Sequence, residues 1–296
     1  MAEFCSVVSV RLEELFPVRG DGTSPLQESI RHSLLASGKR VRPMLTLATA
    51  RFFGAAEDVA LDPACAVEMV HTASLIVDDL PCMDDARLRR GRTANHLVFG
   101  EHVATLAAIE LLNRAFGTVA CAKGIPSDVR ARLGECLSLS IGLEGLVGGQ
   151  LLDLQSAGRR PDREEVVDVY GRKTGALLSV SIEIGARVAG AEAPVLHQLN
   201  EFSSKLGLAF QILDDLYDRF GVSEAIGKDV GQDAAKTTLL SHLSAEEACE
   251  DVERLMAAGR EQLAPLGSAG EQLAGLACSL LEEATEFAGR VAQNGT

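Results

Sequence analysis

The stretch LHQLNEFSSKLGLAFQILDDLYDRF, residues 196–220, decides the fold class. Its large apolar side chains recur at gaps of three and four residues, a spacing that collects them into one stripe along an α-helix. The members of this stripe are Leu199, Phe202, Leu206, Phe210, Leu213, Tyr217 and Phe220. Elsewhere in the chain, no stretch alternates between apolar and polar residues as a half-buried strand does. The sequence therefore predicts an all-α protein.

The composition indicates one large domain. The chain has 296 residues, of which 47% are hydrophobic, enough to bury a core without the help of metals or disulfides. Its breaks that contain Gly or Pro are too short to be linkers between domains; they lie at residues 21–24, 124–126, 157–161 and 190–194. We expect a single domain over residues 1–296.

The net charge and the spacing of the cysteines indicate which partners and which cellular compartment to expect. The net charge is −14, and a nucleic-acid partner would need a basic face instead. The seven cysteines have no CxxC spacing, which favours a reduced, cytoplasmic location. No basic segment followed by an apolar run begins the chain, and the most apolar stretch, residues 177–191, contains Glu183 and Arg187. We therefore expect neither a signal peptide nor a membrane span.

Adjacent aspartates occur in only two segments, SLIVDDLPCMDD at 74–85 and AFQILDDLYDRF at 209–220. In the second segment, Gln211, Asp214, Asp215 and Asp218 fall within one arc of a helix. Carboxylates crowded in this way repel each other, and a hard divalent cation such as Mg²⁺ removes the conflict. A solvated acidic face is the alternative, but the flanking leucines and aromatics favour a buried helix and hence a metal.

The first segment has a less regular spacing. Asp84 lies six residues after Asp78, so the two do not share a face of a straight helix. Pro81 lacks an amide hydrogen and predicts that the helix kinks or ends nearby. An irregular turn after that break can bring Asp84 back beside Asp78 and Asp79.

Clusters of basic residues accompany the aspartates. Four arginines lie within residues 87–92, and SGKRVRP contributes Lys39, Arg40 and Arg42. Salt bridges between these groups are the structural alternative. A diphosphate chelated by Mg²⁺ needs both signs of charge, carboxylates for the metal and basic groups for the remaining oxygens. The combination in an acidic protein favours an anionic phosphate ligand.

Seven motifs in order identify a family resemblance: SGKRVRP, DDLPCMD, LRRGR, GLVGGQLLDL, KTGAL, FQILDDLYD and GKDVGQD. Together they resemble the trans-isoprenyl diphosphate synthases, and most of all the bacterial geranylgeranyl diphosphate synthases of carotenoid pathways. The resemblance implies a bundle of roughly ten or more helices around a central substrate cavity. It also implies a homodimer and a head-to-tail condensation of isopentenyl diphosphate with an allylic diphosphate, namely dimethylallyl, geranyl or farnesyl diphosphate.

The resemblance also implies roles for individual residues. Three Mg²⁺ ions would be held by the two aspartate motifs, Asp78, Asp79, Asp84, Asp214, Asp215 and Asp218. The diphosphates would be bound by Lys39, Arg42, His71, Arg89, Arg90, Lys228 and Lys236. Lys173, Thr174 and Gln211 would lie beside the allylic cation that forms when the diphosphate leaves. Tyr170 departs from the pattern, because a His often stands there, three residues before the Lys of KTG.

Chain length of the product is expected to depend on the helix that carries Asp78. Ala73 and Ser74 lie about 7 Å back along that helix, at 1.5 Å per residue. Farnesyl synthases of this family tend to have an aromatic ring at that level. Two small side chains predict an open channel and geranylgeranyl diphosphate as the product.

Other hypotheses about the product and the function remain open at this point. The product can be farnesyl diphosphate or a longer chain, because one residue can change the depth of the channel. A class I terpene cyclase shares one aspartate motif but has no use for SGKRVRP. A non-catalytic subunit of a prenyl synthase usually lacks some of the aspartates, all of which are present here.

Overall fold

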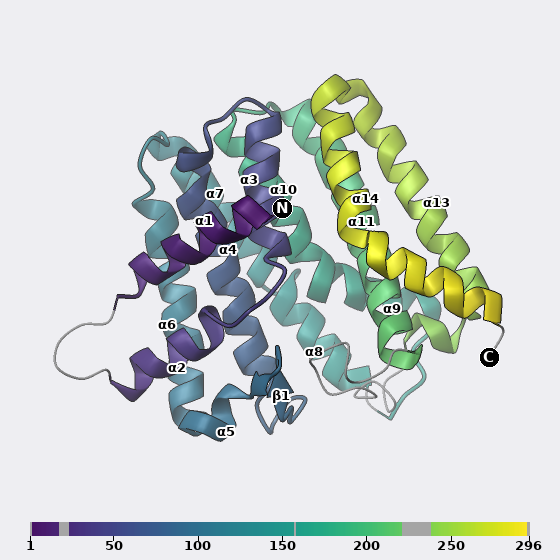
Figure 1. The fold of residues 1–296 in the computed structure, drawn as a ribbon, viewed down its shortest axis with the longest axis horizontal. Coiled ribbons are helices and arrows are strands. Elements are labelled where there is room, and N and C mark those ends of the chain that lie inside the picture. The colour runs from purple at the N-terminus through teal and green to yellow at the C-terminus, as the bar shows by residue number, and fades with distance from the viewer. Residues whose placement is uncertain (1, 18–23, 157, 221–237, 295–296) are drawn as a thin grey trace.

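The computed structural model describes residues 2–17, 24–156, 158–220 and 238–294. Its α-helices are α1 (Ala2–Leu15), α2 (Pro25–Leu34), α3 (Val41–Phe52), α4 (Glu57–Asp78), α5 (Asn95–Phe99), α6 (Glu101–Ala120), α7 (Ser127–Ile141), α8 (Leu146–Ser156), α9 (Arg163–Tyr170), α10 (Ala176–Val188), α11 (Ala193–Phe220), α13 (Ala245–Leu263) and α14 (Gly267–Asn294). A π-helical turn η1 (Gly171–Gly175) and two 3₁₀ turns, η3 (Leu239–Ser241) and η4 (Ala264–Leu266), complete the helical elements. The all-α prediction is confirmed (Figure 1).

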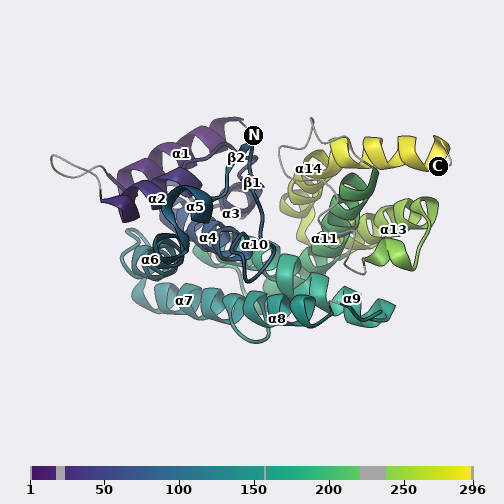
Figure 2. The same cartoon turned by 90° about the horizontal axis from the view of Figure 1, so that it is seen from below.

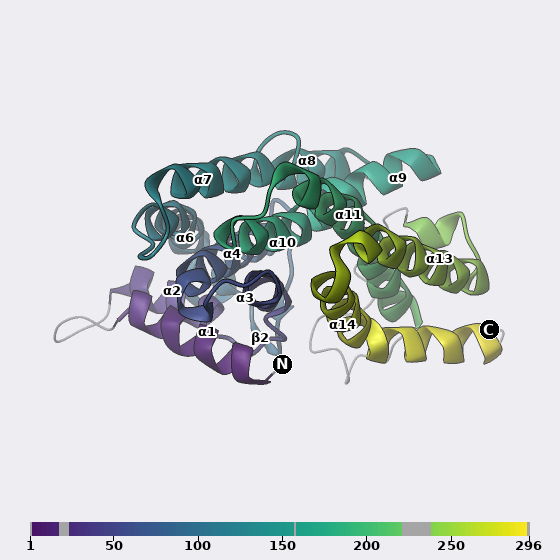
Figure 3. The ribbon, with the colours of Figure 1, turned by 90° about the horizontal axis from the view of Figure 1, so that it is seen from above.

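The helices form two packed groups joined through α10. Helices α1 to α7 lie together on one side of the molecule, and α11, α13 and α14 lie on the other (Figures 1 and 3). Helices α7, α8 and α9 run in a row along one face (Figure 2). On α10, Leu177 and Val180 belong to the core around α4, whereas Leu178 and Ile182 belong to the core around α11. This helix is apolar on opposite faces because both cores pack against it.

Helix α11 is the 28-residue element that the apolar stripe predicts. Leu199, Phe202, Leu206 and Leu213 are buried in the second core. Because the stripe faces the core, Gln211 and Asp214 on the neighbouring arc border the cavity described below.

Helix α4 ends at Asp78, as Pro81 predicts. The chain then turns back, and the backbone N–H of Asp84 donates to the carbonyl of Asp78 at 2.9 Å. Asp85 adopts a left-handed conformation, with φ of 47°, and its N–H donates to the carbonyl of Leu80. The irregular turn expected from the sequence therefore forms and places Asp84 beside the end of the helix.

A small β-hairpin follows and was not predicted. Strands β1 (Leu88–Arg89) and β2 (Arg92–Thr93) pair antiparallel, with Leu88 opposite Thr93. Arg90 and Gly91 between them both have positive φ, 53° and 71°. Two such residues match the right-handed twist of a tight hairpin. With two residues per strand, it is too short to show an alternating pattern.

Within the part of the chain that the structure describes, three helical stretches are long and apolar enough, by length and composition alone, to cross a membrane: Glu57–Asp78, Glu101–Ala120 and Ser127–Ser156. Two-thirds of the apolar window of α4 is buried inside the molecule (67%). Packing in the core therefore explains why α4 is so apolar. The corresponding windows of α6 and of α7 with α8 are 39% and 28% buried.

Candidate active site

A cavity of about 230 Å³ lies between the two packed groups of helices. It brings together twelve of the predicted site residues: Arg42, His71, Ser74, Asp78, Asp84, Arg89, Lys173, Thr174, Gln211, Asp214, Asp215 and Asp218. Lys39, Ala73, Asp79 and Arg90 are not among the residues that line it. Lys228 and Lys236 lie outside the described residues.

The first aspartate motif enters the cavity at the end of α4. Burial raises the pKa of Asp78 to about 6; nearby Lys173 opposes this rise, and the charge of Asp84 adds to it. Burial therefore disfavours the charged form of Asp78, and the neighbouring carboxylate of Asp84 adds to this effect. An added cation would favour the charged form.

Asp79 does not face the cavity. It is 2% exposed, and its Oδ1 accepts hydrogen bonds from Nε and one terminal nitrogen of Arg89, at 2.8 and 2.5 Å. Burial raises the pKa of Asp79, and the bonds from Arg89 oppose that rise. Asp79 thus holds the guanidinium of Arg89, which does line the cavity.

The second aspartate motif contains a buried hydrogen-bonded chain. Asp215 is 4% exposed; the hydroxyl of Tyr170 donates to its Oδ2, and Gln211 Nε2 donates to its Oδ1 at 3.0 Å. The hydroxyl of Thr174 donates to Gln211 Oε1 at 2.7 Å. The N–H of Leu239 donates to the Tyr170 oxygen at 3.1 Å. The Tyr170 hydroxyl therefore connects the end of α9 with α11 and η3.

Lys173 lies in η1, a π-helical turn whose backbone hydrogen bonds span one residue more than those of an α-helix. Its ammonium group donates to Asp153 on α8 at 2.5 Å. Helix α8 approaches this turn so closely that a Cβ on Gly149 would lie 2.5 Å from the backbone nitrogen of Lys173. Only glycine fits there, which explains one glycine of the GLVGGQLLDL motif.

Sequence reasoning assigned no role to Gln150, Asp153 or Tyr170, although all three line the cavity. The side-chain amide of Gln150 is buried with no hydrogen-bond partner among the described residues. A signal was present in the sequence, because Gln150 and Asp153 are the only strongly polar residues of GLVGGQLLDL. Buried polar groups of this kind need a partner, and a bound ligand can supply one.

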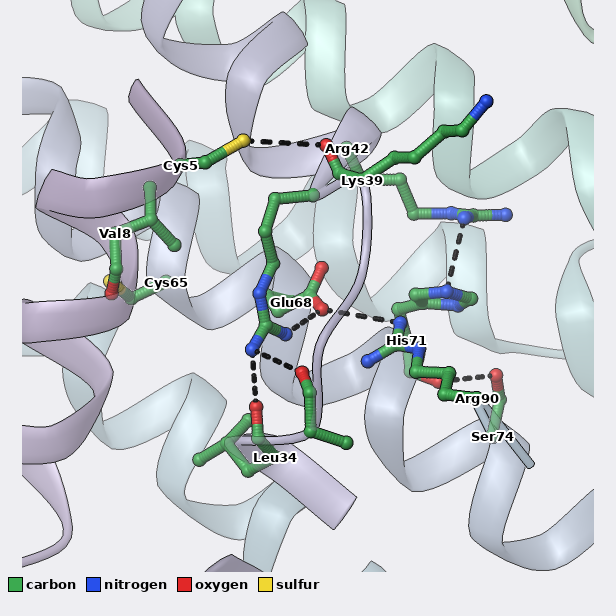
Figure 4. Close-up of polar contacts among 12 residues, drawn as sticks. Cys5, Val8, Leu34, Lys39, Arg42, Cys65, Glu68, His71, Ser74 and Arg90 are labelled. Carbon is green, nitrogen blue, oxygen red and sulfur yellow. Dashed lines mark hydrogen bonds and ion pairs between the residues drawn. The ribbon is translucent and has the colours of Figure 1, made fainter. Parts of the chain in front are cut away.

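The basic side of the site is built on α3 and α4. One terminal nitrogen of Arg42 donates to Nε2 of His71 at 3.2 Å (Figure 4). Burial and the surrounding arginines lower the pKa of His71 well below its ordinary range, so the ring is neutral and accepts this bond. Burial lowers the pKa of Arg42 to about 10, which leaves it charged at neutral pH. Lys39 lies at the surface, 2.7 Å from Glu283 of α14.

The two predicted chain-length residues lie in different surroundings. Ser74 lines the cavity and donates to the carbonyl of His71 at 2.9 Å. Ala73 is 1% exposed and packs in the core around α4. The neighbouring apolar lining includes Leu146 and Leu177.

The carboxylates suit a metal that the substrate helps to hold. Among the described residues, no three His, Cys, Asp or Glu side chains are close enough to form an ion site by themselves. Mg²⁺ is commonly bound by one or two carboxylates together with waters and substrate phosphates. Asp78, Asp84, Asp214 and Asp218 on the cavity wall, with the raised pKa of Asp78, fit such a cation.

The sequence of this chain matches a known protein family. The polyprenyl synthetase family model matches residues 23–263. The chain belongs to this family. It is 47% identical over 235 residues to a geranylgeranyl diphosphate synthase from Pantoea ananas, covering 79% of this chain and 76% of the relative. It is 44% identical over 236 residues to a farnesyl diphosphate synthase from Geobacillus stearothermophilus, covering 77% and 80%.

Solved structures have the same fold. A geranyltransferase from Helicobacter pylori, complexed with magnesium and isoprenyl diphosphate, superposes with a TM-score of 0.87 at 28% identity, covering 95% of this chain and 96% of that one. An apo FPP/GFPP synthase from Zymomonas mobilis gives 0.83 at 32% identity, covering 93% and 96%. The predicted family and fold are confirmed, and the chain is a prenyltransferase.

Proposed function

We propose that this polyprenyl synthetase condenses isopentenyl diphosphate head to tail with allylic diphosphates and releases geranylgeranyl diphosphate. The observation that carries the proposal is the meeting of both aspartate motifs with Arg89 and Lys173 in one cavity. Carboxylates on two helices with basic groups between them match a diphosphate that is bound through cations. The relatives with the names of geranylgeranyl diphosphate synthases support the product.

Magnesium is the proposed cofactor, with three ions per site. The residues that would hold it are Asp78, Asp84, Asp214 and Asp218, which line the cavity. When bound, Mg²⁺ neutralises the diphosphate and makes it a better leaving group. Asp79 and Asp215 were predicted as ligands too; their hydrogen bonds to Arg89 and Tyr170 support positioning roles instead.

The residues near the reacting carbon are suited to stabilise a cation without trapping it. Arg89, fixed by Asp79, binds the departing diphosphate. The Thr174 hydroxyl and the Gln211 amide oxygen lie on the cavity wall, 2.7 Å apart, and direct partial negative charge towards the carbon. The double bond of isopentenyl diphosphate then attacks, and the proton lost from it passes to the released diphosphate.

The second diphosphate is assigned to the side of the cavity formed by Arg42 and His71. The neutral imidazole leaves the full charge of Arg42 available for an anion. Buried guanidiniums bind phosphate oxygens more strongly than exposed ones, because water competes less.

The test is a direct assay of product length. The purified protein is incubated with Mg²⁺, isopentenyl diphosphate and dimethylallyl, geranyl or farnesyl diphosphate in turn, and the products are sized. Geranylgeranyl diphosphate from all three primers is the expected result. A cyclic hydrocarbon, or turnover without isopentenyl diphosphate, would contradict the proposal. Asp78→Ala and Asp214→Ala should each abolish turnover, as should EDTA.

A cytoplasmic homodimer is also proposed. Exposed apolar side chains recur along α6 at Leu106, Ile109 and Phe116, and along α8 at Val147 and Leu151. Apolar faces of this kind on a soluble protein mark interaction surfaces. The incomplete burial of the apolar windows of α6, α7 and α8 fits the same explanation. A second copy of the chain is the partner that the family resemblance favours.

A further inference from the structure

Glu68 is a carboxylate buried among arginines, and the reaction described above gives it no role. It lies in the middle of α4 and is 1% exposed. Its Oε1 accepts a hydrogen bond from Arg40 and another from Arg90, the latter at 3.4 Å (Figure 4). A buried carboxylate costs several kcal/mol in lost hydration unless such partners offset it. The burial of Glu68 therefore depends on its contacts with these arginines.

Both terminal nitrogens of Arg40 make hydrogen bonds within the protein. One terminal nitrogen bonds to Glu68, and the other donates to the carbonyls of Leu34 and Ala36 at 2.7 and 3.0 Å. Arg40 is also in the left-handed conformation, with φ of 47°, at the start of α3. A residue with a Cβ adopts this conformation only when its surroundings hold it there. The contact with Glu68 contributes to holding Arg40 there, together with the bonds to Leu34 and Ala36.

Arg90 is held from two sides. It too has a positive φ, 53°, in the turn of the hairpin, and its side chain reaches back to Glu68. On the other side it lies against the SGKR loop, where a Cβ on Gly38 would be 3.3 Å from its guanidinium carbon. Glycine at this position leaves room for the planar group.

Two buried donors of this cluster have no hydrogen-bond partner among the described residues. They are Nε of Arg42 and one terminal nitrogen of Arg90. Arg40, Arg42 and Arg90 carry three positive charges around one carboxylate, and the His71 beside them is neutral. An excess of buried positive charge with unpaired donors fits an anionic ligand.

We propose that Glu68 is a positioning residue for isopentenyl diphosphate: it anchors Arg40 and Arg90, and so keeps the positive charge of this cluster in place beside Arg42 for the diphosphate. This inference rests on the proposed function. Glu68 touches neither substrate. It offsets the repulsion between the arginines before the substrate arrives and leaves the surplus charge for the diphosphate.

Glu68→Gln tests the proposal, because it keeps the shape and removes the charge. The KM for isopentenyl diphosphate should rise about tenfold or more, the effect of losing one charge-assisted contact. The KM for geranyl diphosphate should stay within about twofold, since Arg89 is held by Asp79 instead. Glu68→Asp, which keeps the charge on a shorter side chain, should show a smaller rise. Glu57→Gln is the matched control, an ion-paired but more exposed glutamate on the same helix.

Binding is measured separately from turnover. Calorimetric titration with isopentenyl diphosphate, without Mg²⁺ or an allylic substrate, should show weaker binding to Glu68→Gln than to the wild type. Equal affinity would overturn the inference while leaving the proposed function intact. No binding to the wild type would overturn both. An equal rise in the KM of both substrates would also overturn it, because a general loss of structure does not discriminate between them.

Gly38→Ala perturbs the same cluster without removing a charge. Its methyl group would press on Arg90, and the φ of Gly38 is not in the region that only glycine favours. We expect the KM for isopentenyl diphosphate to rise here too. This variant decides the matter if Glu68→Gln does not fold. An unchanged KM in Gly38→Ala would then overturn the inference.

Discussion

At the scale of single residues, the two members of the pairs at 78–79 and 214–215 have different surroundings. Asp78 lines the cavity and Asp79 does not; Asp214 and Asp215 both line it, but Asp215 is buried and both of its carboxylate oxygens accept hydrogen bonds within the protein. Successive residues of a helix point about 100° apart, so the two members of a pair meet different neighbours. In the proposed function, the first member of each pair binds the metal and the second supports the site.

The raised pKa of Asp78 predicts a change in stability with pH. Its pKa in the folded protein is about 6, against an ordinary 3.8, so ionisation destabilises the fold as pH rises through this range. Without Mg²⁺, Asp78→Asn should therefore stabilise the protein by about 1–3 kcal/mol above pH 6, and the gain should vanish near pH 4. Thermal melts between pH 4 and 8 measure it, with the exposed Asp58→Asn as control. A gain that does not change with pH would contradict this explanation.

Ser74 is the residue at which product length can be tested most directly. It lines the cavity, so the ring in Ser74→Phe would occupy space that the growing tail needs. We expect this variant to release mainly farnesyl diphosphate. Ala73 packs in the core and does not line the cavity, so Ala73→Phe should mainly lower the Tm, because overpacking a buried site costs about 1–3 kcal/mol. Products of wild-type length from Ser74→Phe would mean that the tail leaves the cavity on another side.

At the scale of elements, the site is assembled where regular helices stop or deform. Helix α4 ends at Asp78, the hairpin turns at Arg90, and η1 widens at Lys173. The end of α4 and the turn η1 place Asp78 and Lys173 on the wall of the cavity, whereas Arg90 lies behind it against Glu68. The Tyr170 hydroxyl links three further elements: the end of α9, the C-terminal part of α11 and the start of η3.

Removing that hydroxyl should affect both stability and the metal requirement. Tyr170→Phe leaves Asp215 and the N–H of Leu239 without one partner each, which costs about 1–3 kcal/mol. We expect a lower Tm and a higher Mg²⁺ concentration for half-maximal activity. Tyr217→Phe is the matched control, since the other tyrosine of the chain donates to a carbonyl in a partly exposed position. An equal effect of both variants would show that Tyr170 has no special link to the metal site.

At the scale of the whole molecule, the two aspartate motifs belong to different packed groups. One ends α4 in the first core, and the other lies on α11 in the second. Helix α10 packs against both and so fixes the distance across the cavity. A catalytic site at such a boundary depends on the whole fold.

The proposed dimer gives a prediction at this scale. The double variant Leu106→Glu, Ile109→Glu places charge on the exposed apolar face of α6 and should yield a monomer. Light scattering coupled to size-exclusion chromatography measures the mass. Val10→Glu on α1, which is exposed to a similar degree, should leave the dimer intact. A dimer that persists in the double variant would place the interface elsewhere.

The sequence by itself determined the helical class, the two aspartate motifs and the family. Periodicity and motif order are local properties, so the stripe of α11 and the break at Pro81 could be predicted without coordinates. Only the tertiary structure decided that Asp79 supports Arg89, that Tyr170 and Asp153 belong to the site, and that Glu68 lies among arginines. These contacts join residues from 10 to 45 positions apart in sequence, and packing alone brings such residues together. The short hairpin of β1 with β2 was missed for a different reason: two residues per strand are too few to show an alternating pattern.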